Sequence, residues 1–345
     1  MSKRKARLAI NGFGRIGRAL ARISARDPDC TFELVAVNDL VPVESLAYLT
    51  RYDSVHGRFE QPVTVEGGNL RIGEQTVVIT AERDPAALPW GKLDVDLVVE
   101  CTGRFRRRSQ AAAHLAAGAR RVVISAPGDK KDPPDATVVC GINDDLIGPE
   151  HKILSAASCT TTCLAPVAVA LDDAFGIESG WMTTVHAFTN DQALVDVPHA
   201  KDARRGRNAA ANIVPTSTGA AQAIGLVVPR LAGKLSGAAI RVPTPDVSLI
   251  DLIVKTNKPV TADAVNAALS AAAGSFDRGV MRMEHDPVVS SDLIGESTGA
   301  VIDAALTTVP GENLAHVVAW YDNEWGYASR LYALLCKLAA RGTEG

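Results

Sequence analysis

A glycine-rich loop between a short strand and a helix constrains the fold of this chain more than any other feature. The strand spans Arg7 to Ile10, GxGxxG follows at Gly12, Gly14 and Gly17, and apolar residues then recur at helical spacing through Ile23. Such glycines allow a tight turn and a close backbone approach to a pyrophosphate, which the helix N-terminus holds. We therefore expect a dinucleotide to contact Gly12, Gly14, Arg15, Ile16 and Gly17.

An acidic residue follows the next strand at the distance that a dinucleotide site requires. Residues 32–37 form this strand, and Asp39 lies just beyond it. A carboxylate about 20 residues after the glycines suits the adenosine ribose hydroxyls. No arginine for a 2′-phosphate follows in Leu40-Val41-Pro42, so the pattern favours NAD over NADP. The alternative role of Asp39 is to cap a helix that starts near Val43, and both roles are compatible.

Apolar runs alternate with a helical segment through the rest of the first half. Residues 95–100 and 121–125 predict strands, 109–119 predict a helix, and 56–90 predict antiparallel edge strands. Buried runs between helices indicate a doubly wound parallel sheet in an α/β fold. Ligands bind at the carboxyl ends of such strands, which adds Thr102 and Ser125 to the expected cofactor crevice.

Composition excludes several classes of protein. The chain has 345 residues, enough for two domains, and its formal charge of -3 gives no reason to expect nucleic acid or an anionic membrane as partner. No apolar stretch approaches the ~20 residues of a membrane span. The six cysteines follow no disulfide or zinc spacing, so we expect no metal and a reducing, cytoplasmic location.

Cys159 is the strongest candidate nucleophile. It follows the short strand Ile153-Leu154 and the residue Ser158, and the apolar run 164–170 comes after it. A strand–turn–helix reading puts Cys159 in the first helical turn, where the dipole favours an anion. The thiol would then ionise near neutral pH and act as the nucleophile. The alternative is a small buried apolar side chain.

His186 is the candidate base. Residues 181–188 predict a strand on which Thr184, His186 and Phe188 share one face. A strand that returns after the helix could bring His186 beside Cys159, and a Cys–His pair generates a thiolate. His199 is the rival, but its polar loop suggests the surface.

Basic and hydroxyl residues beyond the strand indicate two anion sites. The long polar loop 189–212 contains Arg205, and residues 215–221 have the composition of an anion-binding helix start. Arg241 is expected just before a strand at 247–254. Separate arginine and threonine clusters suit phosphates, whereas the alternative is salt bridging to neighbouring acids.

Several stretches together resemble one enzyme family over essentially the whole chain. The stretches are Asn11 to Arg18, Tyr52 to Gly57, Ser158 to Thr161, Thr183 to His186, Pro215 to Ala221, Arg241 to Thr244, and Trp320 to Glu324. In these motifs the chain resembles the NAD-dependent, phosphorylating glyceraldehyde-3-phosphate dehydrogenases. The resemblance implies an α/β fold with a Rossmann-type domain and an α+β catalytic domain whose sheet is mostly antiparallel. It implies an NAD-binding domain at 1–157, completed by a C-terminal helix at 326–345, and a catalytic domain at 158–325.

The resemblance also implies residue roles. Cys159 would attack the aldehyde, and His186 would accept the hydroxyl proton as hydride leaves. The resulting thioester would pass its acyl group to inorganic phosphate. Thr189 and Arg241 would bind the substrate phosphate and Asn323 the nicotinamide carboxamide. Inorganic phosphate would contact Ser158, Thr160, Arg205, Thr218 and Gly219, and loop 189–212 would pack between the subunits of a homotetramer.

Two substitutions depart from the family pattern without removing a chemical role. Thr162 and Asp246 each stand where the family usually has asparagine. An erythrose-4-phosphate dehydrogenase is the nearest enzymatic alternative, although Thr218 to Ala221 resemble the glyceraldehyde-phosphate branch. A catalytically weak relative that binds another molecule, such as RNA, is a third possibility, against which the complete set of Cys159, His186 and Arg241 argues.

Overall fold

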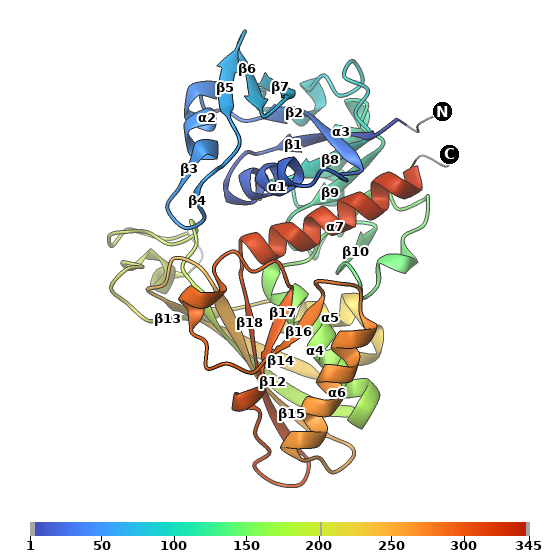
Figure 1. Ribbon diagram of the computed structural model, residues 1–345, viewed down its shortest axis with the longest axis vertical. Helices are drawn as coiled ribbons and strands as arrows, with labels where there is room; N and C mark the ends of the chain where they lie inside the picture. The colour runs from blue at the N-terminus through green and yellow to red at the C-terminus, as the bar shows by residue number, and fades with distance from the viewer. Residues whose placement is uncertain (1–3, 201, 343–345) are drawn as a thin grey trace. The chain divides into compact units, whose positions relative to one another are not determined.

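The computed structural model describes residues 4–200 and 202–342. The chain divides into two compact units. Figure 1 colours the chain from blue at the N-terminus to red at the C-terminus. The first unit is Met1–Cys140, Asp144–Ala157 and Leu331–Gly345, and the second is Gly141–Asn143 and Ser158–Arg330. Within the described residues, every helix is too short or too polar to cross a membrane.

The first unit is built on a nine-stranded sheet. Its first seven strands in spatial order pair in parallel and the last two are antiparallel. In that order the strands are β10 (Ala136–Thr137), β11 (Ile153–Ser155), β9 (Arg121–Ile124), β8 (Leu97–Glu100), β1 (Ala6–Asn11), β2 (Phe32–Asn38), β7 (Gln75–Thr80), β6 (Asn69–Ile72) and β5 (Val63–Glu66). A separate hairpin pairs β3 (Tyr52–Asp53) with β4 (Gly57–Arg58).

Helices cover both faces of this sheet. Successive side chains of a strand point to opposite faces, so each face contributes to its own hydrophobic core. Leu8 and Ile10 of β1 pack in one core with α1 (Arg15–Arg26), α2 (Val43–Arg51) and the later part of α7 (Trp325–Gly342). Ala9 packs in the other with α3 (Arg108–Ala116). Residues buried on both faces are typical of parallel strands, and the expected doubly wound sheet is confirmed.

The second unit contains a seven-stranded mixed sheet. Two pairs, β12–β14 and β16–β17, are parallel and the other ladders are antiparallel. The spatial order is β13 (Val214–Ser217), β14 (Leu235–Val242), β12 (Ile177–Ala187), β15 (Ser248–Thr256), β18 (Leu314–Tyr321), β17 (Ala300–Asp303) and β16 (Met281–Glu284). The mostly antiparallel sheet expected for the second domain is therefore confirmed.

In the described part of the second unit, the α-helices that lie wholly inside it are α4 (Cys159–Phe175), α5 (Ala220–Val227) and α6 (Ala262–Ser275). Helix α4 contacts both other helices and strands of the sheet. Its Leu164, Val167 and Leu171 are completely buried. Burying such a side chain contributes about 1.5–3 kcal/mol, so α4 anchors the core beneath the sheet.

Three sequence expectations need adjustment. The sequence predicts antiparallel edge strands at 56–90, but β7 lies inside the sheet and pairs in parallel with β2. The sequence places Arg241 ahead of a strand, but the structure puts it inside β14. The expected C-terminal helix begins at Trp325, and its predicted residues 343–345 lie outside the described part of the chain.

Candidate active site

Local backbone features place Cys159 at the start of α4. The Ser158 hydroxyl accepts the Thr161 N–H at 3.1 Å and caps the helix. Ala157 immediately before it has a φ of 55°, which is a left-handed conformation that costs about 1 kcal/mol or more for a residue with a Cβ. The helix ends at Gly176, whose φ of 70° is easy only for glycine. This sharp entry makes Cys159 the first residue of the helix.

The structure brings Cys159 and His186 together. The Cys159 Sγ lies 3.5 Å from the His186 Nε2. His186 is the penultimate residue of β12 and is only 4% exposed. The rival His199 instead accepts the Asp202 N–H within loop 189–212 and lies 3.6 Å from the carboxylate of Asp191. Of these two histidines, only His186 therefore contacts the Cys159 sulphur.

Contacts on the other ring nitrogen decide which nitrogen of His186 can accept a proton. The Nδ1 lies 2.7 Å from the carbonyl oxygen of Ala187, and a guanidinium nitrogen of Arg241 lies 2.8 Å from Nδ1 and 3.0 Å from the same carbonyl. We assign the proton to Nδ1, which donates to the Ala187 carbonyl, and the Arg241 N–H then donates to that carbonyl and not to Nδ1. Nε2 then presents its lone pair to the thiol, as a base requires.

Burial decides the charge of the two groups. Burial and, to a lesser extent, the Arg241 cation lower the pKa of His186 to about 3, while the bond to Ala187 opposes the shift. Burial also raises the pKa of the Cys159 thiol, against the Arg241 charge and the donors at the start of α4. The expectation that the helix start alone would lower the thiol pKa is therefore wrong, because burial outweighs it. Both shifts favour a neutral thiol beside a neutral imidazole.

Tyr321 belongs to the site although the sequence analysis gives it no role of its own within the stretch Trp320 to Glu324. Its buried hydroxyl lies 2.8 Å from the hydroxyls of both Thr160 and Thr184, and its ring packs edge-on against His186 at 5.9 Å between centroids. These contacts tie α4, β12 and β18 together behind the reactive pair. The signal in the sequence is weak, since a tyrosine at the end of an apolar strand is common.

Arg205 occupies the predicted second anion site, but its donors already have partners. Its guanidinium bonds the Thr216 hydroxyl at 2.9 Å, the Asp191 carboxylate at 2.7 Å and the Ser217 carbonyl at 3.1 Å. Thr218 accepts the Ala220 N–H at 3.2 Å, and Gly219 is the N-cap of α5. Both readings of Arg205 from the sequence, ion pair and anion ligand, thus remain open.

Other predicted phosphate contacts lie in two places. Thr189 follows β12 and is partly exposed, two residues beyond the carbonyl that Arg241 contacts. Ser158 and Thr160 lie at the start of α4, where Thr160 is buried and its hydroxyl is engaged with Tyr321. At this end of the helix, the backbone N–H groups are better placed than the Thr160 hydroxyl to meet an anion.

A hydrogen-bond chain orients Asn323. The Ser248 hydroxyl donates to the Asn323 Oδ1 at 2.6 Å and accepts the Ala187 N–H at 3.0 Å. The preceding Val247 has a φ of 65°, unusual for a β-branched residue, and this turn positions Ser248. With Oδ1 used as the acceptor, the amide NH₂ is left as the donor of Asn323.

The glycine loop of the first unit fits a dinucleotide. A Cβ on Gly12 would lie 2.7 Å from the Thr102 nitrogen, so only glycine fits there. A Cβ on Gly14 would meet nothing within 4 Å, and α1 has neither a side-chain cap nor an acid in its first turn. The helix start is thus open to a pyrophosphate. Arg15 pairs with Asp53, so its backbone is the part directed to the loop, while Ile16 and Gly17 continue the helix.

Asp39 reaches the same loop. Its carboxylate accepts the Phe13 N–H at 2.7 Å and the Val41 N–H at 3.2 Å. Asp39 does not cap α2, whose N-cap is Pro42 without a side-chain bond. At the ends of the next strands, Thr102 bonds to Glu100 through its N–H and its hydroxyl, and Ser125 donates to the Glu100 carbonyl at 3.2 Å.

A dinucleotide-type domain and a Cys–His pair at a helix start define the class: an oxidoreductase that acts through a cysteine nucleophile. Comparisons with known proteins identify the family. Residues 6–108 match the model for the NAD binding domain of glyceraldehyde 3-phosphate dehydrogenase, and residues 158–323 match that for its C-terminal domain. The chain therefore belongs to the glyceraldehyde-3-phosphate dehydrogenase family, as its motifs predict.

Curated relatives agree over nearly the full length. The chain is 50% identical over 337 residues to glyceraldehyde-3-phosphate dehydrogenase 1 of Bacillus subtilis, covering 97% of this chain and 99% of the relative. The Geobacillus stearothermophilus enzyme gives the same identity and coverage. Glyceraldehyde-3-phosphate dehydrogenase 2 of Streptomyces arenae is 51% identical over 329 residues, 95% of this chain and 97% of that protein.

Proposed function

We infer that this protein is an NAD-dependent glyceraldehyde-3-phosphate dehydrogenase. It converts glyceraldehyde 3-phosphate, NAD and inorganic phosphate into 1,3-bisphosphoglycerate, NADH and a proton. The observation that carries this conclusion is the Cys159 Sγ at 3.5 Å from His186 Nε2 at the start of α4. An assay of NADH formation from glyceraldehyde 3-phosphate and from erythrose 4-phosphate, each with and without phosphate, tests it. Phosphate-dependent turnover should be far faster with the first aldehyde.

The first half of the reaction forms a thioester. Cys159 Sγ adds to the aldehyde carbon as its proton moves to His186 Nε2 and on to the new hydroxyl, giving a thiohemiacetal. The backbone N–H of Cys159 and the His186 ring stabilise the charge on its oxygen. Bound NAD supplies the hydride acceptor. His186 takes the hydroxyl proton as the hydride leaves carbon, and an acyl group stays on the sulphur.

The second half transfers the acyl group. A phosphate oxygen attacks the thioester carbon, the carbon–sulphur bond breaks, and the proton held on His186 returns to the leaving sulphur. The low pKa of His186 favours this half, because an imidazolium with a pKa of about 3 releases its proton readily to the leaving sulphur.

We assign the anion sites as follows. Arg241 and Thr189 bind the substrate phosphate, and Arg205, Thr218, Gly219, Ser158 and Thr160 bind inorganic phosphate. The position of Arg241 beside His186 supports the first assignment. At the second site, inorganic phosphate must compete with the Asp191 carboxylate for Arg205. Because inorganic phosphate enters only in the second half of the reaction, we expect Arg205 to affect that step alone.

Alanine variants should separate the two sites. Losing a charge-assisted hydrogen bond to an anion costs about 1.5–3 kcal/mol, or roughly 10- to 150-fold. Arg205→Ala should weaken apparent phosphate binding by that factor and keep the single-turnover NADH burst without phosphate. Arg241→Ala should slow or shrink the burst itself. Arg207→Ala is the matched control, because this exposed arginine of the same loop pairs with Asp196. A burst lost equally in Arg205→Ala and Arg241→Ala would contradict two separate sites.

Asp39 should set the preference for NAD. We propose that its carboxylate binds the ribose hydroxyls and repels a 2′-phosphate, together with contacts from Gly12 to Gly17, Thr102 and Ser125. Asp39→Gly should lower kcat/KM for NAD by roughly 10- to 150-fold and raise it for NADP. Asp39→Asn, which keeps an acceptor for the Phe13 N–H, separates charge from loop support. Wild-type protein that used both cofactors equally would refute this role.

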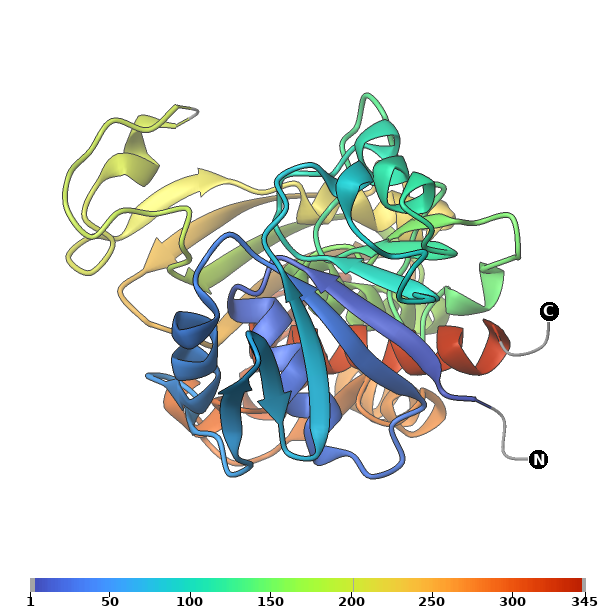
Figure 2. The same ribbon diagram turned by 90° about the horizontal axis from the view of Figure 1, so that it is seen from above.

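We also propose the division of labour and the assembly. Residues 1–157 with the helix at 326–345 bind NAD, residues 158–325 carry out the chemistry, and Asn323 donates to the nicotinamide carboxamide. Loop 189–212 packs between subunits of a homotetramer. Its Leu194 and Val195, 74% and 65% exposed, support this interface. In Figure 2 the yellow-green loop extends beyond the sheet of its own unit. The six free cysteines support a cytoplasmic location.

A further inference from the structure

A basic cavity lies in the first unit, at the amino-terminal ends of its parallel strands. The cofactor loop lies at the opposite, carboxyl-terminal ends of these strands. The cavity has a volume of about 630 Å³. It is lined by the first residues of β1, β8 and β9, by Lys152 just before β11, and by the end of α7. The glycine loop and Asp39 follow the carboxyl ends of β1 and β2, whereas this cavity lies at the amino ends of the parallel strands. It is therefore a separate site.

The charges around the cavity do not balance. Arg4 and Arg120 share the carboxylates of Asp94 and Asp96 in a cluster of ion pairs. Asp96 is the only acidic residue among the described residues that line the cavity. Three further cations line it, and none of them forms an ion pair within the described part of the chain: Arg121, Lys152 and Arg341.

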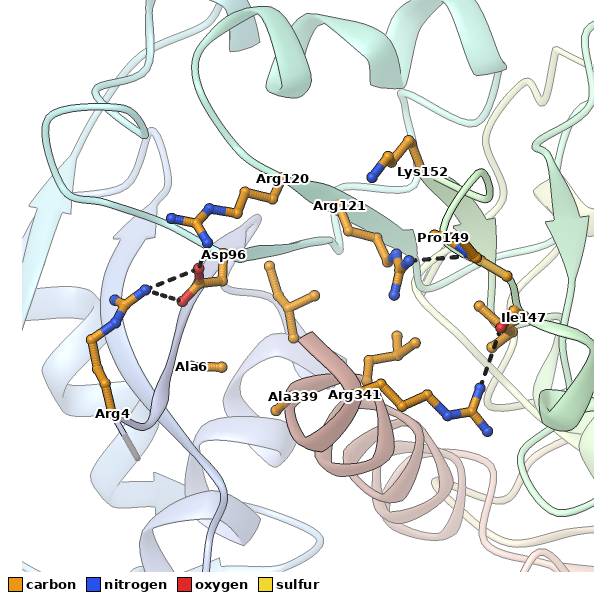
Figure 3. A pocket seen from close by; sticks show the side chains of 13 residues that line it. Arg4, Ala6, Asp96, Arg120, Arg121, Ile147, Pro149, Lys152, Ala339 and Arg341 are labelled. Carbon is orange, nitrogen blue, oxygen red and sulfur yellow. Dashed lines mark hydrogen bonds and ion pairs between the residues drawn. The ribbon is translucent and has the colours of Figure 1, made fainter. Parts of the chain in front are cut away.

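Two of these cations are held toward the same space by backbone carbonyls. Arg121 donates to the Gly148 carbonyl at 3.3 Å, and its buried Nε has no hydrogen-bond partner among the described residues. Arg341 donates to the carbonyls of Asp144 and Ile147, the nearer at 2.9 Å. Figure 3 shows Arg121 reaching from β9 toward the end of α7 that carries Arg341. Burial and the Arg341 charge lower the pKa of Arg121, which an anion between the two would relieve.

The rest of the lining is apolar. Leu97, Ile147, Pro149, Leu338 and Ala339 line the same cavity. A bare inorganic anion would use only the cationic part of such a site. A ligand that fills it needs an anionic group and an apolar or aromatic body, and cavities of roughly 300–1,000 Å³ hold small organic molecules.

We propose that this cavity binds a small organic phosphate, with the phosphoryl group among Arg121, Lys152 and Arg341 and the apolar body on Leu97, Ile147 and Leu338. Arginine and lysine together provide charge-assisted donors for a phosphoryl group. The proposal does not depend on the dehydrogenase reaction, because no residue of this cavity belongs to the proposed catalytic or cofactor set.

Calorimetric titration of the full chain in saturating NAD tests this proposal. NAD occupies the cofactor loop, so further binding of adenosine monophosphate reports this cavity or one of the two phosphate sites proposed above, and the substitutions below tell these apart. We expect saturable binding of adenosine monophosphate at millimolar concentrations or below, and binding about tenfold weaker or more for uncharged adenosine. Inorganic phosphate, which lacks the apolar body, should also bind more weakly.

Substitutions locate the site. Arg121→Met and Lys152→Gln should each weaken binding of adenosine monophosphate by about tenfold or more. Lys92→Gln is the matched control, because this exposed lysine of the same unit does not line the cavity and should leave binding unchanged. The exposed Lys152 keeps the test valid if Arg121→Met fails to fold. No saturable binding, equal binding of inorganic phosphate, or binding that Lys152→Gln leaves unchanged would overturn the proposal.

Discussion

Replacing Cys159 with serine should lower dehydrogenase turnover by about 10⁴-fold or more. A serine hydroxyl loses its proton far less readily than a thiol, and the neutral His186 is too weak a base to remove it. An oxygen ester would also be a poorer acyl donor to phosphate than a thioester. NADH formation under saturating substrates measures the loss. Cys163→Ser is the matched control, one turn further along α4 and packed near the Ala319 carbonyl, and it should keep most activity.

Chemical labelling of the wild-type protein tests the assignment of Cys159 in a second way. Iodoacetamide should inactivate the protein in step with modification of Cys159. The structure adds a competitor, since a hydrogen bond from Cys30 lowers the pKa of Cys336 against the effect of burial. Cys336→Ser should leave the inactivation rate unchanged. Inactivation that required Cys336, or full activity in Cys159→Ser, would contradict the assignment of the nucleophile.

His186→Gln should slow turnover by about 10²- to 10⁴-fold, which is the usual contribution of a positioned general base. Burial raises the pKa of the Cys159 thiol, so below that pKa the sulphur keeps its proton unless His186 accepts it. Without the imidazole, the thiolate forms only as the pH rises through the raised pKa. The variant should therefore gain activity with pH, and its gap from wild type should narrow in alkali.

Iodoacetamide inactivation rates across pH provide the measurement for His186→Gln. His199→Gln is the control, because His199 bonds within loop 189–212 and has no contact with the sulphur among the described residues. A gap between His186→Gln and wild type that stays constant with pH would show that His186 does not act as the proton acceptor.

The first unit is predictable from local sequence patterns. Its central strands β1, β2, β8 and β9 contain apolar runs, and GxGxxG marks the loop where close packing on Thr102 requires glycine. The second unit is harder. Strand β14 contains Ser236, Gly237, Ala238 and Ala239, which have little preference for strands, so its sequence carries no clear signal. It forms because β12 and β13 pair on either side of it.

The reactive pair is predictable in kind, whereas its surroundings depend on strand register. A cysteine at a helix start and a histidine on a returning strand suggest the pair of Cys159 and His186. Arg241 lies beside His186 because the two are register partners in the β12–β14 ladder, which no local pattern encodes. Tyr321 reaches the site through a similar long-range pairing of β18 with β15. The direction of the Cys159 pKa shift also depends on burial, which the motif does not reveal.

Mass spectrometry of the acyl-enzyme tests the central claim most directly. Protein mixed with NAD and glyceraldehyde 3-phosphate, without inorganic phosphate, should gain the mass of one acyl group per chain in step with the NADH burst. Peptide mapping should locate that group on Cys159, and added phosphate should remove it as an acyl phosphate. An NADH burst without a covalent adduct, or an adduct on any residue other than Cys159, would contradict a mechanism through a Cys159 thioester.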